Sequence, residues 1–135
     1  MDKITHLPEN DTYVSVKYVE TQQVKDGVEC DIYTFYANTS RDLAVVRVAK
    51  GFKTPLQKIL KGDETVEKYV SGTGTLNVTD VDGTKHVHNF PNDSHKDEVI
   101  VGIGQIMQWT ANDDLVFYEI CTPPYEDGRF ENLPE

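Results

Sequence analysis

GFKTPLQKILKGDETVEKYVSGTGTLNV, residues 51–78, is the stretch that decides the fold class. Gly62-Asp63 predicts a turn between two short β-prone runs, Leu56–Lys61 and Val66–Val70. Gly72-Thr73-Gly74 predicts a kink or bulge, after which strand character continues over Thr75–Val81. Short strands separated by glycine turns, with no helical period between them, are typical of all-β proteins.

The chain on both sides of this stretch has the same character. Asp26-Gly27 and Asp82-Gly83 each stand between two β-prone runs and predict hairpins. Further strands are predicted over Tyr13–Val19, Val28–Tyr36, Leu43–Ala49, Lys85–Phe90, Glu98–Val101, Gln105–Ala111 and Leu115–Ile120. We therefore predict one all-β sandwich or barrel domain over residues 13–125, preceded by an irregular arm (1–12) and followed by an acidic tail (126–135).

Composition narrows the possible partners and the compartment. The 135 residues carry a formal net charge of −10, which argues against nucleic acid or an anionic membrane as partner. The longest uncharged stretch, Val99–Asn112, is too short and too polar to span a bilayer. The N-terminus shows no apolar run of a signal peptide, so we expect a cytoplasmic protein. Cys30 and Cys121 are then expected as reduced, buried thiols, with a disulfide as the alternative.

The segment GFKTPLQKILKGDETVEKYVSGTGTLNV, residues 51–78, resembles the first motif of the cupin superfamily, in particular its small single-domain bacterial members. That motif is a glycine, five residues, His-x-His, three or four residues, Glu, six residues and a glycine. Gly51 is followed after five residues by Gln57-Lys58-Ile59, so the spacing is present and both histidines are replaced. Four residues separate Ile59 from Glu64, as the motif requires, whereas Glu67 has the required six residues before its glycine, Gly74, so both remain candidates for the glutamate.

A second segment resembles the other cupin motif, which ends in a histidine, three residues and an asparagine. Gln108 and Asn112 have this spacing, and again the histidine is replaced. The resemblance implies a jelly-roll β-barrel, that is, a double-stranded β-helix. It also implies a divalent metal held by three histidines and one glutamate inside the barrel. Glutamine and isoleucine are poor substitutes for imidazole, so we expect no cofactor at the usual position.

A different histidine cluster keeps a divalent metal open as an alternative. His86 and His88 alternate on one strand and therefore share a face, and His95 lies in the following loop. The competing interpretation places both histidines on the solvated face of the sheet, with Val87 pointing inward.

The remaining candidate site is a barrel pocket whose metal positions have become polar and uncharged. Amides and aromatic rings suit a small polar ligand, because sugar faces stack on aromatic rings and hydroxyls bond to amides. The predicted pocket residues are Arg47, Gln57, Ile59, Glu67, Tyr69, Gln108, Trp109 and Asn112.

Three functions remain open at this point. The favoured hypothesis is a cupin-fold protein that binds a small sugar-like or organic-acid ligand without the His-ligated metal. The first alternative is a metal-dependent isomerase or dioxygenase with a rearranged site. The second alternative is a structural homodimer, in which Tyr13–Val19 crosses to cover a neighbour's sheet edge. We expect a homodimer under the favoured hypothesis as well.

Overall fold

A computed structural model describes residues 2–7, 12–36, 39–92 and 96–135, and its side chains from residue 15 onward. The described residues form strands and turns, and they contain no helix. The strands are β1 (Asp2–Leu7), β2 (Thr12–Lys25), β3 (Val28–Phe35), β4 (Asp42–Val48), β5 (Gln57–Ile59), β6 (Glu64–Ser71), β7 (Gly74–Thr79), β8 (Lys85–Phe90), β9 (Glu98–Val101), β10 (Ile106–Ala111), β11 (Leu115–Thr122) and β12 (Phe130–Asn132). No helix long and apolar enough to cross a membrane occurs in these residues.

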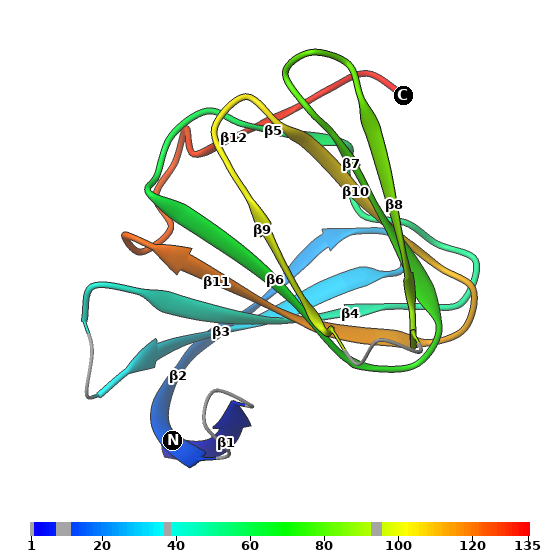
Figure 1. The fold of residues 1–135 in the computed structure, drawn as a ribbon. Coiled ribbons are helices and arrows are strands. Elements are labelled where there is room, and N and C mark those ends of the chain that lie inside the picture. The colour runs from blue at the N-terminus through cyan, green and yellow to red at the C-terminus, as the bar shows by residue number, and fades with distance from the viewer. Residues whose placement is uncertain (1, 8–11, 37–38, 93–95) are drawn as a thin grey trace.

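The strands form two antiparallel sheets (Figure 1). One sheet has seven strands in the order β1-β2-β3-β4-β11-β6-β9, and the other has five in the order β12-β5-β10-β7-β8. Neighbours such as β4 and β11, or β10 and β7, are far apart in sequence, as in a jelly roll. The predicted all-β, jelly-roll class is therefore confirmed.

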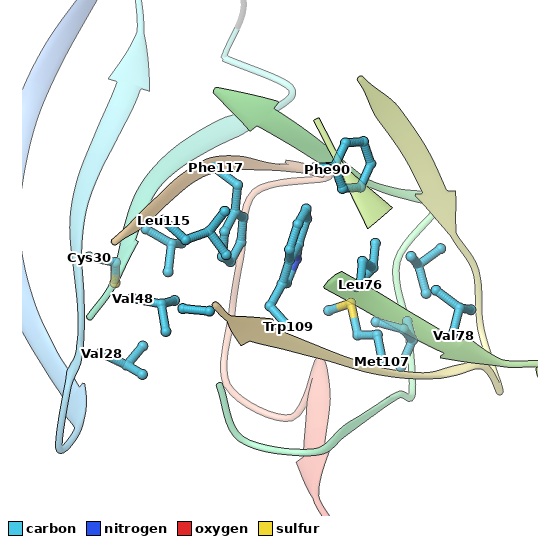
Figure 2. Close-up of a cluster of buried hydrophobic side chains, with 14 residues drawn as sticks. Val28, Cys30, Val48, Leu76, Val78, Phe90, Met107, Trp109, Leu115 and Phe117 are labelled. Atoms are coloured by element: carbon cyan, nitrogen blue, oxygen red, sulfur yellow. The ribbon is translucent and has the colours of Figure 1, made fainter. Parts of the chain in front are cut away.

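The main core fills the space between the two sheets. Inward-facing residues alternate along each strand, as in β10, where Met107, Trp109 and Ala111 are buried. Figure 2 shows Trp109 between Phe117 and Phe90. The Trp109 ring stacks on Phe117 with centroids 4.3 Å apart, and its centroid lies 5.5 Å from that of Phe90. These rings join the two sheets, since Phe117 belongs to β11 and Trp109 to β10.

A second apolar cluster lies on the opposite, outer face of the seven-stranded sheet. Leu43, Val66 and Ile120 come from three neighbouring strands and are almost fully buried there. Val16 of β2 belongs to the same cluster. Strand β2 pairs with β3 and β1 within the chain, and the homodimer stays a prediction.

Gly72 lies where the chain passes from one sheet to the other. The prediction of one strand with a kink is wrong here, because β6 and β7 belong to different sheets. Gly72 has a φ of 93°, and a Cβ at this position would lie 1.9 Å from the carbonyl oxygen of Asp114. Only glycine fits both the backbone conformation and the close approach.

Both ends of the chain are more regular than the sequence predicts. The expected irregular arm (1–12) contains β1, which pairs with β2. The expected acidic tail (126–135) contains β12, which pairs with β5. Arg129, just before β12, is 1% exposed and donates hydrogen bonds to the carbonyl oxygens of Pro123 and Glu64. Pairing with distant strands and this buried anchor hold segments that have little strand character of their own.

Candidate functional site

A cavity of about 300 Å³ opens between the sheets, at the low end of the size range of ligand pockets. Its deep wall is apolar and aromatic, formed by Trp109, Phe117 and Met107, which are almost fully buried. The polar part of the wall is acidic or uncharged and comprises Glu20, Gln22, Cys30, Asp42, Thr54, Gln57, Glu67, Glu119, Cys121 and Tyr125. Lysine, arginine and histidine are absent from the described residues that line the cavity.

Two glutamates face each other in this wall. Glu67 on β6 and Glu119 on β11 are directly opposite partners in the antiparallel register, so their side chains share the inner face of the sheet. Glu67 is 1% exposed, and its Oε1 accepts a hydrogen bond of 3.1 Å from Nε1 of Trp109. Its Oε2 is buried and receives no hydrogen bond from any described residue. A buried acceptor without a donor is costly, so this atom needs a proton or a ligand.

Burial and mutual repulsion change the acidity of this carboxyl pair. Burial raises the pKa of Glu67 well above its usual value, and the charge of Glu119 raises it further. Burial also raises the pKa of Glu119, to which the charge of Asp42 adds. A hydrogen bond between the two carboxyl groups raises the pKa of Glu67 further and lowers that of Glu119, so the pair holds one proton more easily than none.

The two thiols in the cavity wall are free and buried, as predicted. Burial raises the pKa of Cys30 to about 11, and burial also raises that of Cys121. Cys30 is level with Val46 of the intervening strand, whereas Cys121 is level with Asp42 of the same strand. This offset of four residues separates the thiols by more than a disulfide spans, on the order of 10 Å along the strands alone. Both thiols are therefore neutral packing groups.

Three of the predicted pocket residues line the cavity: Gln57, Glu67 and Trp109. Gln57 lies directly opposite Met107 in the β5–β10 pair, and both face inward. The Nε2 of Gln57 donates to Oδ1 of Asn132 at 3.1 Å. The glutamine at the first cupin histidine position thus faces the barrel interior.

Three other predicted residues do not line the cavity. Ile59 is 1% exposed and belongs to the main core. Tyr69 stacks on Phe90 and donates its hydroxyl to the carbonyl oxygen of Gly72 at 2.6 Å. Asn112 is exposed in the turn after β10.

The placement of Gln108 and Arg47 in the pocket is wrong. Gln108 lies between the inward-facing Met107 and Trp109, so it points away from the cavity, where its Nε2 donates to the carbonyl oxygen of Thr54 at 2.9 Å. Arg47 lies on the outer face of β4, between the core residues Val46 and Val48. Adjacent strand residues face opposite sides of a sheet, which excludes both residues from the interior.

The histidine strand also differs from the expectation. His86 and His88 lie opposite the core residues Val78 and Leu76, so they share the inner face, and Val87 is 60% exposed on the outer face. The interpretation with Val87 inward is therefore wrong. The Nε2 of His86 lies 2.7 Å from Oδ2 of Asp80. His95 lies outside the described residues.

Several cavity residues were missed by the sequence interpretation, above all Glu119, Asp42 and Glu20. The alternation of β11 contained a usable signal, because Leu115, Phe117 and Cys121 are inward-facing apolar positions and Glu119 falls in the same phase. Its pairing with Glu67 joins strands distant in sequence and leaves no local signal.

Comparisons with known proteins give a match at the level of structure. No family model and no curated protein matches the sequence. Oxalate decarboxylase of Lactobacillus farciminis, solved as a formate complex, is similar with a TM-score of 0.66 and 18% identity over 87% of this chain and 33% of that one. A mutant of Bacillus subtilis oxalate decarboxylase is similar with a TM-score of 0.69 and 20% identity, over 85% of this chain and 30% of that one. This chain thus spans about a third of the length of those structures.

A metal is implied by the fold, and one Bacillus subtilis oxalate decarboxylase structure concerns its Mn(II) centers. The described residues of this chain contain no group of three or more His, Cys, Asp or Glu side chains placed to hold a metal ion. Among the described residues, the cavity wall offers no imidazole, and one of the positions expected to hold a histidine is the buried Ile59. These residues do not fit a centre made of histidines and one carboxylate.

At this level of identity the similarity establishes the architecture and leaves the chemistry to this chain's own residues. The two sheets, their strand order and the inward-facing positions of Gln57, Ile59 and Glu67 agree with the resemblance found in the sequence. The chain therefore has the cupin-type fold.

Proposed function

We propose that the chain binds a small, sugar-like polar ligand in the cavity between its sheets, without a His-ligated metal. The observation that carries this proposal is the combination of the Trp109 ring with the buried, donor-free Oε2 of Glu67 in one cavity wall. The faces of Trp109 pack against Phe117 and Phe90, so the ring contributes its edge to an apolar wall that suits the C–H groups of a sugar, and a carboxyl oxygen suits a hydroxyl group.

The charge of the cavity wall distinguishes the two ligand classes that the sequence left open, a sugar-like ligand and an organic acid. An organic acid needs a cationic or strong donor group to offset its charge on entry. The described lining offers carboxyl, thiol, amide and hydroxyl groups and no cationic side chain. A sugar-like ligand is therefore favoured over an organic acid such as oxalate.

Calorimetry and thermal shift with neutral monosaccharides and with oxalate and succinate test this proposal. We expect binding of at least one neutral sugar and none of the dicarboxylates. Because the proposal needs no metal, treatment with a chelator is expected to leave the sugar affinity unchanged. Dicarboxylate binding without sugar binding, or loss of binding on chelation, contradicts the proposal.

A cavity-filling variant locates the site. Ala44 lines the cavity, so Ala44→Phe is expected to abolish sugar binding. Val87→Phe adds the same ring on the exposed outer face and serves as the matched control, with unchanged affinity expected. Circular dichroism checks that both variants fold.

A further inference from the structure

The facing glutamates of the cavity point to a more specific ligand. Resting on the proposed function, we infer that the ligand carries a protonated amino group that binds between Glu67 and Glu119, as in an amino sugar or amino alcohol. This assignment deepens the function from a sugar-like ligand to an amine-bearing one.

The charge of the glutamate pair has no cationic partner in the described cavity wall. Glu67 and Glu119 occupy directly opposite positions on one face, and no cationic side chain of the described residues lines the cavity beside them. Arg129 lowers the pKa of Glu119 through its charge, yet its hydrogen bonds go to backbone oxygens and to Oγ1 of Thr65. Arg129 therefore offsets the charge of Glu119 only from a distance, and among the described residues no cationic side chain is bonded to either carboxyl group.

One carboxyl oxygen of Glu67, Oε2, receives no hydrogen bond from the described residues. Glu67 belongs to the cavity wall and is almost fully buried, Trp109 satisfies its Oε1, and the equally buried Oε2 has no donor among the described residues. An ammonium group has three donors, so it can bond to Oε2 of Glu67 and to Glu119 at the same time. A sugar hydroxyl has one donor and serves only one of these acceptors.

The rest of the described cavity wall is also acidic or uncharged. Asp42 lies one strand further, on β4, and Glu20 lies on β2, so the acidic groups extend from the deep pair along the cavity wall. The other titratable groups in the described wall are Cys30, Cys121 and Tyr125, and all three are neutral because burial raises the pKa of each. The whole lining thus favours positive over negative charge.

Binding of the ammonium group has a defined proton balance. Without ligand, the two carboxyl groups share one proton, which satisfies Oε2 of Glu67. When the ammonium group enters, this proton leaves to solvent, and one cation then faces two carboxylates. No covalent bond of the ligand forms or breaks.

Glucose and glucosamine are matched probes, because they share a ring and differ by one amino group. Calorimetry is expected to show about tenfold or greater preference for glucosamine over glucose. Titrations in two buffers with different ionisation heats are expected to show proton release on glucosamine binding alone. Glu119→Gln and Glu67→Gln keep the side-chain size and are each expected to reduce the preference to about twofold or less. Glu131→Gln, on the exposed face of β12, is the control and should keep it.

The outcomes separate this inference from the proposed function. Equal affinity for glucose and glucosamine overturns the amine assignment and leaves sugar binding intact. A preference that survives in both glutamine variants places the amino group elsewhere and also overturns it. A preference for glucosamine without proton release overturns the inference that the amino group displaces a proton shared by Glu67 and Glu119. Binding of neither probe contradicts both proposals. Thermal melts check that each variant is folded, and two independent variants guard against failure of one.

Discussion

Two acidic groups on opposite faces of the same sheet differ in how their charge is compensated. On the outer face, Glu29 of β3 lies directly opposite Arg47 of β4, and Asp31 lies two residues further along β3. The guanidinium group of Arg47 is 2.8 Å from an oxygen of each carboxylate. On the inner face, Glu67 lies directly opposite Glu119, and none of the described residues that line the cavity places a cationic side chain beside them. The outer group is a complete ion cluster and the inner group is incomplete.

The difference shows how a site can be recognised without a metal or a motif. The outer carboxylates are partly exposed and paired, so they are satisfied whether or not a ligand is present. The inner pair combines burial with like charge, so in the empty protein it must hold a proton to satisfy the otherwise donor-free oxygen of Glu67, and holding it costs free energy at neutral pH. Such a cost is characteristic of functional sites.

Removing Trp109, the hydrogen-bond donor to the inner glutamate Glu67, is expected to have the largest effect on the free energy of unfolding. Trp109→Ala deletes the ring that stacks on Phe117 and the indole that donates to Glu67. Loss of a buried aromatic side chain costs about 3–5 kcal/mol of unfolding free energy. Trp109→Phe keeps a ring and loses the donor, so it should cost clearly less. Urea denaturation measures both, and equal losses would show that the hydrogen bond, not the packing, accounts for the effect of Trp109.

The same sheet shows what the sequence predicts well and what it does not. Local turn chemistry identified both hairpins, and β8 and β9 have the predicted bounds. By contrast, β12 depends on pairing with β5 and on the buried hydrogen bonds of Arg129, none of which is local in sequence.

The site was partly predictable for the same reason. Gln57, Glu67 and Trp109 were found because motif spacing and residue type indicated them. Gln108 was predicted beside Trp109 in one pocket, although neighbouring strand residues face opposite ways. Glu119 was in phase with Phe117, but its role depends on the pairing of β6 with β11, which no local pattern encodes.

Removing one carboxylate of the inner pair is expected to have an intermediate effect on the free energy of unfolding. Unlike Trp109→Ala, it should stabilise the protein. The pKa of Glu67 and that of Glu119 are raised from an ordinary value of 4.5, so the folded state favours their protonated forms. Their stabilising contribution is complete below that value and is lost as pH rises through the folded-state pKa. Glu119→Gln should therefore be more stable than the wild type by about 1–3 kcal/mol at about pH 8. The gain should shrink toward about pH 5.

Urea denaturation across this pH range tests the intermediate effect. Glu131→Gln controls for the loss of one negative charge from an acidic chain, and it should show no comparable gain. A Glu119→Gln variant that is less stable than the wild type at every pH would show that the inner carboxylate is compensated after all.

Removing the outer group's cation is expected to have the smallest effect, although it leaves two carboxylates without their partner. Arg47→Met keeps the aliphatic contacts of the side chain and deletes the guanidinium group. The side chains of Arg47 and Glu29 are 36% and 44% exposed, so water and salt take over much of the lost interaction. We expect a loss of about 0.5–1 kcal/mol in urea denaturation at low salt, which falls further as salt is added. Ligand affinity should not change, because Arg47 lies on the face away from the cavity. A loss of unfolding free energy as large as that of Trp109→Ala would contradict this expectation. It would mean that solvent exposure does not weaken the ion pairs of Arg47.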